Sequence, residues 1–461
     1  MLKLIFILKL IELIKLDFIP HDNKTIAEML NVINISSLEE LYQDIPNDLI
    51  IEKSNLPPGL TEPDLLQHLE NVSRRNKTYS NSFLGAGCYY HYIPTIVDFV
   101  ISRSEFYTSY TPYQAEASQG YLQAIYEYQT LISKLTQMEI ANASMYDGST
   151  ALAEAAIMAT IITRKRTILL LKGIHPEYEE VVKTYCWGQD INIETCTEET
   201  LLTKINDNTA AVLIQSPNFF GDIEDVSKIT QTVKEKSQNC LIVQAMTDPT
   251  CLGVLIPPGS TDIDIFIAEG QSFGISPSFG GPGLGIFTAK QKYMRKMPGR
   301  LIGKTKEISG DQEGYILTLQ AREQHIRREK ASSNICTNQA LCSLAALTYL
   351  LALGRTGLKE IASQNIQKAH YLKKQLKKLP GYEILNKKPT YNEFLIRCPN
   401  IEYLLEACKE RNLLPPLKIS NYYPEMQNVA LVCVTEMNSV ESIKAFIDAA
   451  QSALKKKEER K

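Results

Sequence analysis

The stretch DIDIFIAEGQSFGISPSFGGPGLGIFTAK, from Asp262 to Lys290, is the most informative part of the sequence. Its first apolar run, from Ile263 to Ala268, is typical of a buried β-strand, and a second strand is expected to begin at Gly285. A polar turn with Gln271 and a run rich in glycine and proline separate the two strands. The plainest interpretation is a glycine-rich loop that joins two core strands.

A second interpretation is a cofactor site that lacks its anchoring residue. In enzymes that use pyridoxal phosphate, a turn of this kind commonly carries the lysine that forms a Schiff base with the cofactor. Here Gln271 occupies the turn, and Lys290 comes only after the second strand. The stretch is therefore also consistent with a pyridoxal-phosphate type of fold that has no lysine at this position.

The composition narrows the class of protein. A chain of 461 residues is too long for one ordinary core, so two or three domains are expected. The net charge is only −3 and charges of both signs are well mixed, so neither nucleic acid nor a membrane is indicated as a partner. The ten cysteines show no CxxC spacing and the six histidines are scattered. We therefore expect no metal site, and free thiols in a cytoplasmic protein.

Residues 1–80 are expected to form an N-terminal extension and an arm rather than a domain. The first twenty residues, MLKLIFILKLIELIKLDFIP, place charges on all sides of a helical wheel. This pattern suits neither a membrane-spanning helix nor an interfacial one, and a secretory signal needs a longer uncharged centre. We interpret residues 1–16 as an appendage, and we expect short helices in the rest of the arm.

Tyrosines are concentrated in the next segment, with nine of them between residues 89 and 128. The last three, Tyr121, Tyr126 and Tyr128, have helical spacing and are expected to pack in the protein core. The others stand in loop-like sequence, where a ring with one polar end suits the wall of a pocket or a subunit interface, with core packing as the alternative. The candidates for such a wall are Tyr89, Tyr90, Tyr107, Tyr110, Tyr113 and Gln114.

A phosphate cradle is the next candidate site. Gly148, Ser149 and Thr150 open an alanine-rich helix, whose free N–H groups and positive dipole end favour an anion, although the same residues are also ordinary helix caps. Strands and helices then alternate, which predicts a mostly parallel sheet with ligands at the carboxyl ends of its strands. The strands are expected at 167–171, 210–214, 241–244, 263–268 and 285–289. The cradle, His175, Asp248 and Gln271 fall at that edge.

The expected domains are a large α/β domain at 81–330 and a smaller α+β domain at 331–461. The segment 291–333 is polar and basic in parts, as a linking segment or the wall of a second layer would be. An apolar helix is expected from Cys336 to Leu353, a charged helix at 359–378, and strands near 393–397 and 429–434.

Several motifs together are similar to those of one family. GAGCYYHYIPTIV, YTSYTPYQAEASQGYL, GQSFGISPSFGGPGLGIF, MPGRLIGKT and SNICTNQAL stand in the order and spacing of the glycine cleavage system P-protein, in its N-terminal subunit type. The resemblance covers Leu16 to about residue 450. It implies a fold type I pyridoxal-phosphate transferase-like structure, in which this subunit type has Gly-Gln-Ser where its homologous partner has His-Lys-Thr.

The resemblance also implies a division of labour between subunits. The C-terminal-type partner would bind pyridoxal phosphate in an α2β2 assembly, and this chain would hold none covalently. The pair would act as a glycine dehydrogenase that decarboxylates glycine and transfers the aminomethyl group to lipoylated H-protein. Gly148, Ser149, Thr150, His175, Asp248 and Gln271 would then be vestiges of a cofactor site, and the tyrosines would wall the partner's active site.

Two other functions remain open on the sequence alone. One is a non-catalytic scaffold or regulator that has lost its cofactor. The other is a stand-alone pyridoxal-phosphate enzyme that uses Lys290 or another lysine, with Cys336 as a nucleophile.

Overall fold

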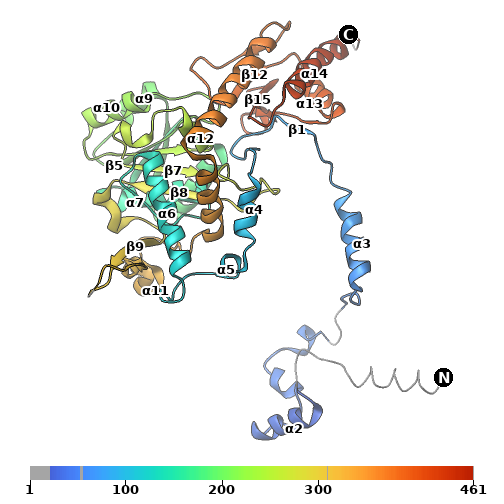
Figure 1. The fold of residues 1–461 in the computed structure, drawn as a ribbon, viewed down its shortest axis with the longest axis vertical. Coiled ribbons are helices and arrows are strands. Elements are labelled where there is room, and N and C mark those ends of the chain that lie inside the picture. Colours follow the sequence, from blue (N-terminus) through green and yellow to red (C-terminus); the bar gives the residue numbers. More distant parts are fainter. Residues whose placement is uncertain (1–20, 52–54, 309, 460–461) are drawn as a thin grey trace, which may run out of the picture. The chain divides into compact units, whose positions relative to one another are not determined.

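The computed structural model describes residues 21–51, 55–308 and 310–459 (Figure 1). These residues form two compact units, the first ending at Lys77 and the second running from Thr78 to the C-terminus. The appendage expected at residues 1–16 lies outside the described residues.

The first unit is a helical arm with little core. Its helices are α2 (Asn23–Val32) and α3 (Glu62–Ser73), joined through two short 3-10 turns, and neither helix has a buried residue. The apolar side chains of α3 are instead exposed, with Leu66 at 61% and Leu69 at 53%. The arm at residues 1–80 stays a prediction from the sequence.

The second unit is built around a seven-stranded sheet. Its order is β2 (Ile140–Ala141), β8 (Gly285–Ala289), β7 (Ile265–Glu269), β6 (Leu241–Met246), β5 (Thr209–Gln215), β3 (Thr167–Leu171) and β4 (Asn192–Cys196). The strands from β7 to β4 are parallel, and β8 and β2 run antiparallel to their neighbours. This sheet confirms the predicted α/β, mostly parallel fold.

Helices cover both faces of the sheet, which explains why its central strands are apolar throughout. Successive strand residues point to opposite faces. In β3, Ile168 and Leu170 join a core under α7 (Gly148–Thr163) and α8 (Pro176–Trp187). Leu169 and Leu171 join the core that includes residues of α6 (Gln119–Thr136), α10 (Val226–Lys236) and α12 (Ala340–Leu376). A strand buried on both faces needs no polar alternation.

A smaller antiparallel sheet forms the C-terminal part. Its order is β11 (Glu383–Ile384), β12 (Glu393–Arg397), β15 (Val429–Cys433) and β14 (Leu417–Lys418). Helices α13 (Ile401–Glu410) and α14 (Val440–Glu459) share a separate hydrophobic core with this sheet. The short strand β1 (Asn81–Ser82) pairs in parallel with β13 (Leu413–Leu414). The smaller α+β part is thus present, while the boundaries at 330 and 331 stay a prediction.

One segment of the second unit differs from the sequence prediction. The segment 291–333, expected to be a linking segment or the wall of a second layer, contains a hairpin of β9 (Leu301–Lys306) and β10 (Glu313–Thr318). The two helices predicted near the C-terminus are present as the two halves of α12, which Gly354, with φ +59° and a non-helical backbone, separates directly after Leu353. Within the described residues α12 is also the one helix long and apolar enough to cross a membrane, but half of its most apolar window is buried in the protein.

The loop between β5 and α10 packs against β12 of the smaller sheet, and this contact makes Gly221 sensitive to substitution. Gly221 has φ +88°, and a Cβ added there would lie 2.3 Å from the carbonyl oxygen of Glu393 in β12. We expect Gly221→Ala to lower the free energy of unfolding by about 2 kcal/mol or more, because backbone strain and a backbone clash combine. Gly120→Ala in α6 is the control, since nothing lies within 4 Å of its added Cβ. Equal urea midpoints for the two variants would contradict the prediction.

Candidate active site

The candidate residues meet at the carboxyl edge of the large sheet, as predicted. Gln271 follows β7, Asp248 follows β6, and His175 comes after β3 at the start of α8. Gly148 is the first residue of α7. The parallel strand order brings these positions together because the carboxyl ends of neighbouring parallel strands share one edge.

Gln271 is buried, and its side-chain amide is fully used by backbone groups. Its Oε1 accepts a hydrogen bond from the N–H of Tyr89 at 2.9 Å, and its Nε2 donates to the carbonyl oxygens of Tyr89 at 3.1 Å and Ile275 at 2.5 Å. An amide cannot form a Schiff base with an aldehyde. Gln271 therefore ties the start of the tyrosine-rich segment to the turn after β7 and offers no anchor for a cofactor.

The first turn of α7 is already occupied by two carboxylates. The N–H of Gly148 donates to Oε2 of Glu269 at 2.8 Å, and the N–H of Thr150 donates to Oδ1 of Asp147 at 2.8 Å. Ser149 also donates from its hydroxyl to Asp147 at 2.6 Å. These donors are the ones that a phosphate cradle requires. A bound phosphate would have to displace two acids and would face their negative charge.

Glu269 connects three segments of the chain from inside the protein. Besides Gly148, its carboxylate accepts hydrogen bonds from the N–H groups of Gln271 and Leu284, each at 2.9 Å. Burial raises the pKa of Glu269 to about 7, against the opposing effect of these backbone donors. Position 148 also has no room for a side chain, because a Cβ on Gly148 would lie 2.5 Å from the hydroxyl of Tyr178.

Asp248 has a cationic partner supplied by the chain itself. Its Oδ2 lies 3.2 Å from Nε2 of His91, and Nδ1 of the same ring lies 2.8 Å from Oε2 of Glu436. Burial alone would lower the pKa of His91, but the two carboxylates raise it to about 10, so the ring is an imidazolium at neutral pH. Asn392 donates a further hydrogen bond to Asp248 at 2.6 Å. Its other oxygen, Oδ1, accepts hydrogen bonds from the N–H of Thr250 at 3.2 Å and from the Thr250 hydroxyl at 2.6 Å, so both carboxylate oxygens are already paired within the chain.

His175 has a structural role at the start of α8. Its Nδ1 accepts a hydrogen bond from the N–H of Glu177 at 3.2 Å, and its Nε2 lies 2.9 Å from the carbonyl oxygen of Ala86. The ring contacts Phe219 with a centroid distance of 4.9 Å, and burial lowers the pKa of His175. As a neutral ring, His175 caps α8 and donates a hydrogen bond to the carbonyl oxygen of Ala86, so both ring nitrogens are used within the chain.

The residues at this edge therefore do not fit pyridoxal phosphate. The amine is missing, Glu269 and Asp147 hold the helix N-terminus, and His91 pairs with Asp248. Sequence analysis missed Glu269 and His91, because nothing in the local pattern shows that a residue ending a strand turns its carboxylate back onto a helix 121 positions away. Among the described residues, no group of three His, Cys, Asp or Glu side chains could hold a metal ion.

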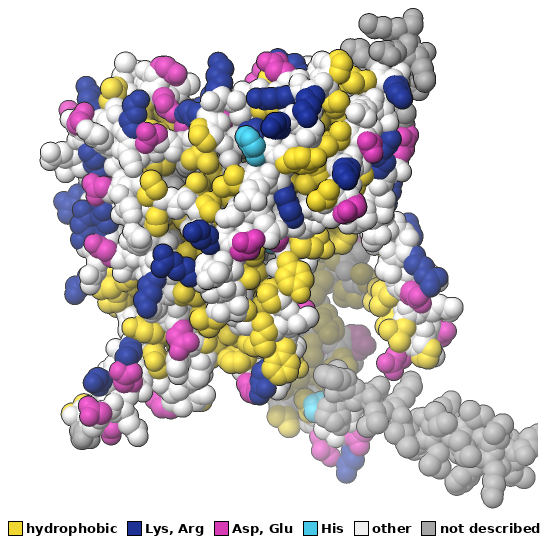
Figure 2. Space-filling view, turned by 45° about the horizontal axis from the view of Figure 1, so that its top comes forward, with side chains coloured by type: hydrophobic (Ala, Val, Ile, Leu, Met, Phe, Trp, Pro, Cys, Tyr) yellow, Lys and Arg dark blue, Asp and Glu magenta, His cyan; other side chains and the backbone are white. Residues whose placement is uncertain are grey.

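The tyrosine candidates fall into two groups. Tyr89 is buried at 1% exposure and donates from its hydroxyl to Glu393 at 2.8 Å, so it belongs to the interior of this chain. The other candidates are exposed: Tyr90 at 47%, Tyr107 at 57%, Tyr110 at 75% and Tyr113 at 61%, together with Gln114. Hydrophobic side chains, aromatic rings among them, gather on the surface shown in Figure 2.

Arg300 holds part of this surface in place and was not singled out from the sequence. It is buried, and its guanidinium donates to the hydroxyl of Tyr113 at 2.9 Å, to that of Thr111 at 2.9 Å and to that of Thr337 at 3.0 Å. The guanidinium also lies 5.1 Å from the centroid of the Tyr113 ring. The exposed ring is thus oriented by a charge beneath it. The only local signal is an arginine that precedes two apolar strand residues.

Over most of its length the chain is similar to proteins of one family. The family model of the glycine cleavage system P-protein matches residues 16–449. A chain from Carboxydothermus hydrogenoformans named probable glycine dehydrogenase (decarboxylating) subunit 1 is 46% identical over 94% of this chain and 98% of its own length. A chain of the same name from Listeria monocytogenes serotype 4b is 44% identical over 95% and 99%.

Solved structures of two other proteins are similar to this chain in fold. A glycine decarboxylase (P-protein) of the glycine cleavage system, in inhibitor-bound form, has a TM-score of 0.85 at 38% identity, over 95% of this chain and all of its own. The Lactobacillus brevis glutamate decarboxylase has a TM-score of 0.63 at 15% identity, over 90% of this chain and 97% of its own, and supports the fold alone. The family match over nearly the whole chain, together with these relatives, shows that the chain belongs to the glycine cleavage system P-protein family.

Proposed function

We propose that this chain is the N-terminal-type subunit of a glycine dehydrogenase, the P-protein of a glycine cleavage system. It acts with a homologous C-terminal-type subunit in an α2β2 assembly in the cytoplasm. The partner binds pyridoxal phosphate and carries the catalytic lysine. Together they decarboxylate glycine and pass the aminomethyl group to the lipoyl group of the H-protein. The names of the relatives support the enzyme, and the division between subunits is our inference.

The state of the candidate site carries this proposal. Gln271 offers no amine, and the donors at the start of α7 are taken by Glu269 and Asp147. A chain in a family of pyridoxal-phosphate type, with this site filled by its own side chains, needs a second chain to supply the cofactor chemistry.

The exposed aromatic surface supports a protein partner. Near Tyr107 and Tyr110, helix α4 (Thr95–Ile101) exposes Ile96 at 45% and Phe99 at 60%. Contiguous apolar and aromatic surface of this kind marks protein interfaces, since it is costly to leave in water. We propose that this surface faces the partner, with Tyr90 and Tyr113 closest to its active site.

The stand-alone alternative has less support. Lys290 follows β8 and pairs with Asp262 at 2.6 Å, at the edge of the sheet opposite to Gln271. An amine held there by carboxylates cannot reach the candidate site. The scaffold alternative differs from our proposal in one measurable respect, which is the activity of the assembled complex.

Expressed alone, the chain should be colourless, and with its partner it should be part of an active complex. We expect no absorbance from a cofactor aldimine and no lysine trapped by borohydride in the isolated chain.

After co-expression with the C-terminal-type subunit and H-protein, exchange of glycine and bicarbonate carbon should appear. A complex that forms but gives no exchange would favour the scaffold.

Restoring the lysine should not restore the site. We expect Gln271→Lys to bind no pyridoxal phosphate in the isolated chain, because the phosphate position stays blocked by Glu269 and Asp248 stays paired with His91. The double variant Gln271→Lys with Glu269→Gln tests whether charge alone is the obstacle. Cofactor absorbance in the single variant, with glycine decarboxylation, would show that the site is intact.

The exposed tyrosines should affect activity more than assembly. We expect Tyr90→Ala or Tyr113→Ala to lower exchange activity of the complex by about 10²-fold if the hydroxyl takes part in hydrogen bonding or proton transfer. Cofactor content and subunit ratio should stay unchanged. Tyr371→Ala in α12 is a matched control, since that ring is also exposed, at 42%. Full activity in both test variants would place these rings outside the active site.

A further inference from the structure

A groove lies where the C-terminal part of α6 meets the middle of α12, two helices that pack against each other (Figure 1). Its third wall is the 3-10 turn η3 (Pro249–Gly253) with the loop up to Pro257, and its volume is about 980 Å³. The backbones of η3 and α12 come close together there, since a Cβ on Gly253 would lie 2.6 Å from the carbonyl oxygen of Leu358. The groove is therefore a fixed feature of the packed fold.

Aliphatic side chains make up the floor of the groove. Five leucines that belong to the core or pack against it line the groove, namely Leu131, Leu135, Leu252, Leu350 and Leu358. Leu351 of α12 and Val254 also line it and stay open to solvent, Leu351 at 62% exposure. None of the lining residues in the described chain is aromatic. A flat ring would find no partner for stacking, whereas an aliphatic chain finds a matching surface.

Three exposed cations line the same groove. Lys134 comes from α6, and Arg355 and Lys359 come from α12, four residues apart and hence on one helical face. Neither an Asp nor a Glu is among the lining residues that the structure describes. Within the same part of the chain, no carboxylate lies within 4.0 Å of any of these three side chains. The groove thus carries three positive charges that the chain does not neutralise by direct pairing.

The acidic residues nearest to these cations in sequence form hydrogen bonds elsewhere. Glu360, beside Lys359, accepts from the side chain of Gln364 at 3.0 Å along α12. Glu139 accepts from the N–H of Gln291. Neither carboxylate lines the groove, so the positive charge there is in local excess.

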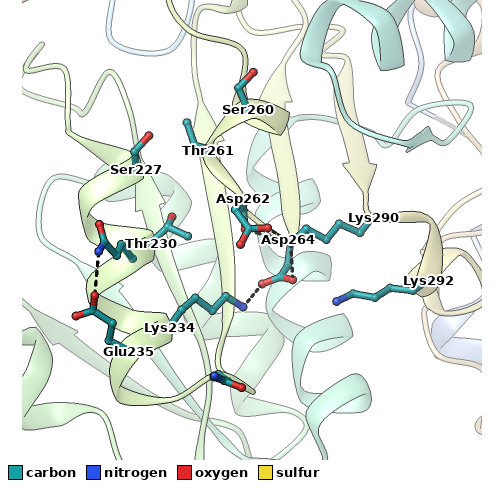
Figure 3. A pocket seen from close by; sticks show the side chains of 12 residues that line it. Ser227, Thr230, Lys234, Glu235, Ser260, Thr261, Asp262, Asp264, Lys290 and Lys292 are labelled. Atoms are coloured by element: carbon teal, nitrogen blue, oxygen red, sulfur yellow. Dashed lines mark hydrogen bonds and ion pairs between the residues drawn. The ribbon is translucent and has the colours of Figure 1, made fainter.

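The polar crevice between α10 and the amino ends of β6 and β7 provides a contrast in charge (Figure 3). Its volume is about 770 Å³, and three lysines line it as well. Three carboxylates line it too, and Lys234 pairs with Asp264 at 2.7 Å, while Lys290 pairs with Asp262 at 2.6 Å. A crevice that balances its own charges does not select an anion, whereas the groove beside α12 does.

We propose that this groove binds an amphiphilic anion, an unbranched aliphatic chain that ends in a carboxylate or a phosphate. The chain lies over the leucine floor, and the anionic end lies against Arg355 and Lys359, with Lys134 adding to the positive field. Gln137 is the one neutral polar side chain among the described lining residues, and its Oε1 already accepts a hydrogen bond from Ser260 at 2.7 Å. A sugar or an extended peptide would therefore leave many of its polar groups unpaired.

Calorimetric titration of the full chain tests this proposal. The probes are octyl phosphate, octanoate, butanoate and octyltrimethylammonium, all below their micellar concentrations. We expect octyl phosphate and octanoate to bind at a single site with a Kd of about 1 mM or tighter. Butanoate should bind about 10-fold more weakly than octanoate, or worse, because its shorter chain buries fewer methylene groups.

The comparison of octyl phosphate with octanoate, at equal chain length, identifies the preferred anion. Octyltrimethylammonium bound as tightly as octanoate would overturn the selection for an anion. Equal binding of butanoate and octanoate would overturn the role of the leucine floor, and no saturable binding of any probe would overturn the site.

Three variants locate the binding. Arg355→Gln combined with Lys359→Gln should weaken the binding of octyl phosphate about 5-fold or more, because two charge-assisted contacts are lost. Leu351→Ser should weaken the binding of octanoate, with little change in the thermal midpoint of the free protein, since this side chain is exposed. Lys374→Gln, at an exposed position of α12 outside the groove lining, is the control and should have no effect. Binding that both test variants leave unchanged would contradict the proposal.

Discussion

The buried carboxylate of Glu269 is the interaction on which the carboxyl edge of the sheet depends. It accepts hydrogen bonds from Gly148, Gln271 and Leu284, which belong to the start of α7, the turn after β7 and the approach to β8. An intramolecular hydrogen bond contributes about 0.5–1.5 kcal/mol on average. One side chain thus stabilises three chain segments and also occupies the N-terminus of α7.

Hydrogen bonds from side chains near the carboxyl edge hold the backbone of the tyrosine-rich segment in place. Gln271 holds the backbone of Tyr89 on both sides, and the hydroxyl of Thr435 donates to the carbonyl oxygen of Tyr90 at 2.7 Å. Glu436, which pairs with His91, also accepts from the N–H of Tyr92 at 2.8 Å. These buried side chains therefore fix the backbone from which Tyr90 and Tyr92 project.

The sequence predicted the fold well because buried strands have a strong local signal. Strands at 167–171 and 285–289 were predicted at the observed bounds, and the absence of a lysine at Gln271 was evident. The hairpin of β9 and β10 was missed because its residues are partly polar and exposed, so they show no continuous apolar run. The pair of His91 and Asp248, 157 residues apart, has no local signal at all. Long-range polar pairing depends on the tertiary fold and cannot be read from spacing.

The buried ionisable groups of the large sheet find partners within the chain at both of its edges. At the carboxyl edge, Asp248 and His91 pair with each other, and Glu269 is held by three backbone N–H groups. At the amino edge, Asp264 accepts hydrogen bonds from Lys234 at 2.7 Å and from the N–H of Ile242 at 3.0 Å. A few buried oxygens stay unpaired among the described residues, for example Oγ of Ser272 beside Gln271, Oγ1 of Thr230 and Oε1 of Gln244. An ion left unpaired in the interior is costly, so pairing within the chain is what allows charge to be buried at either edge.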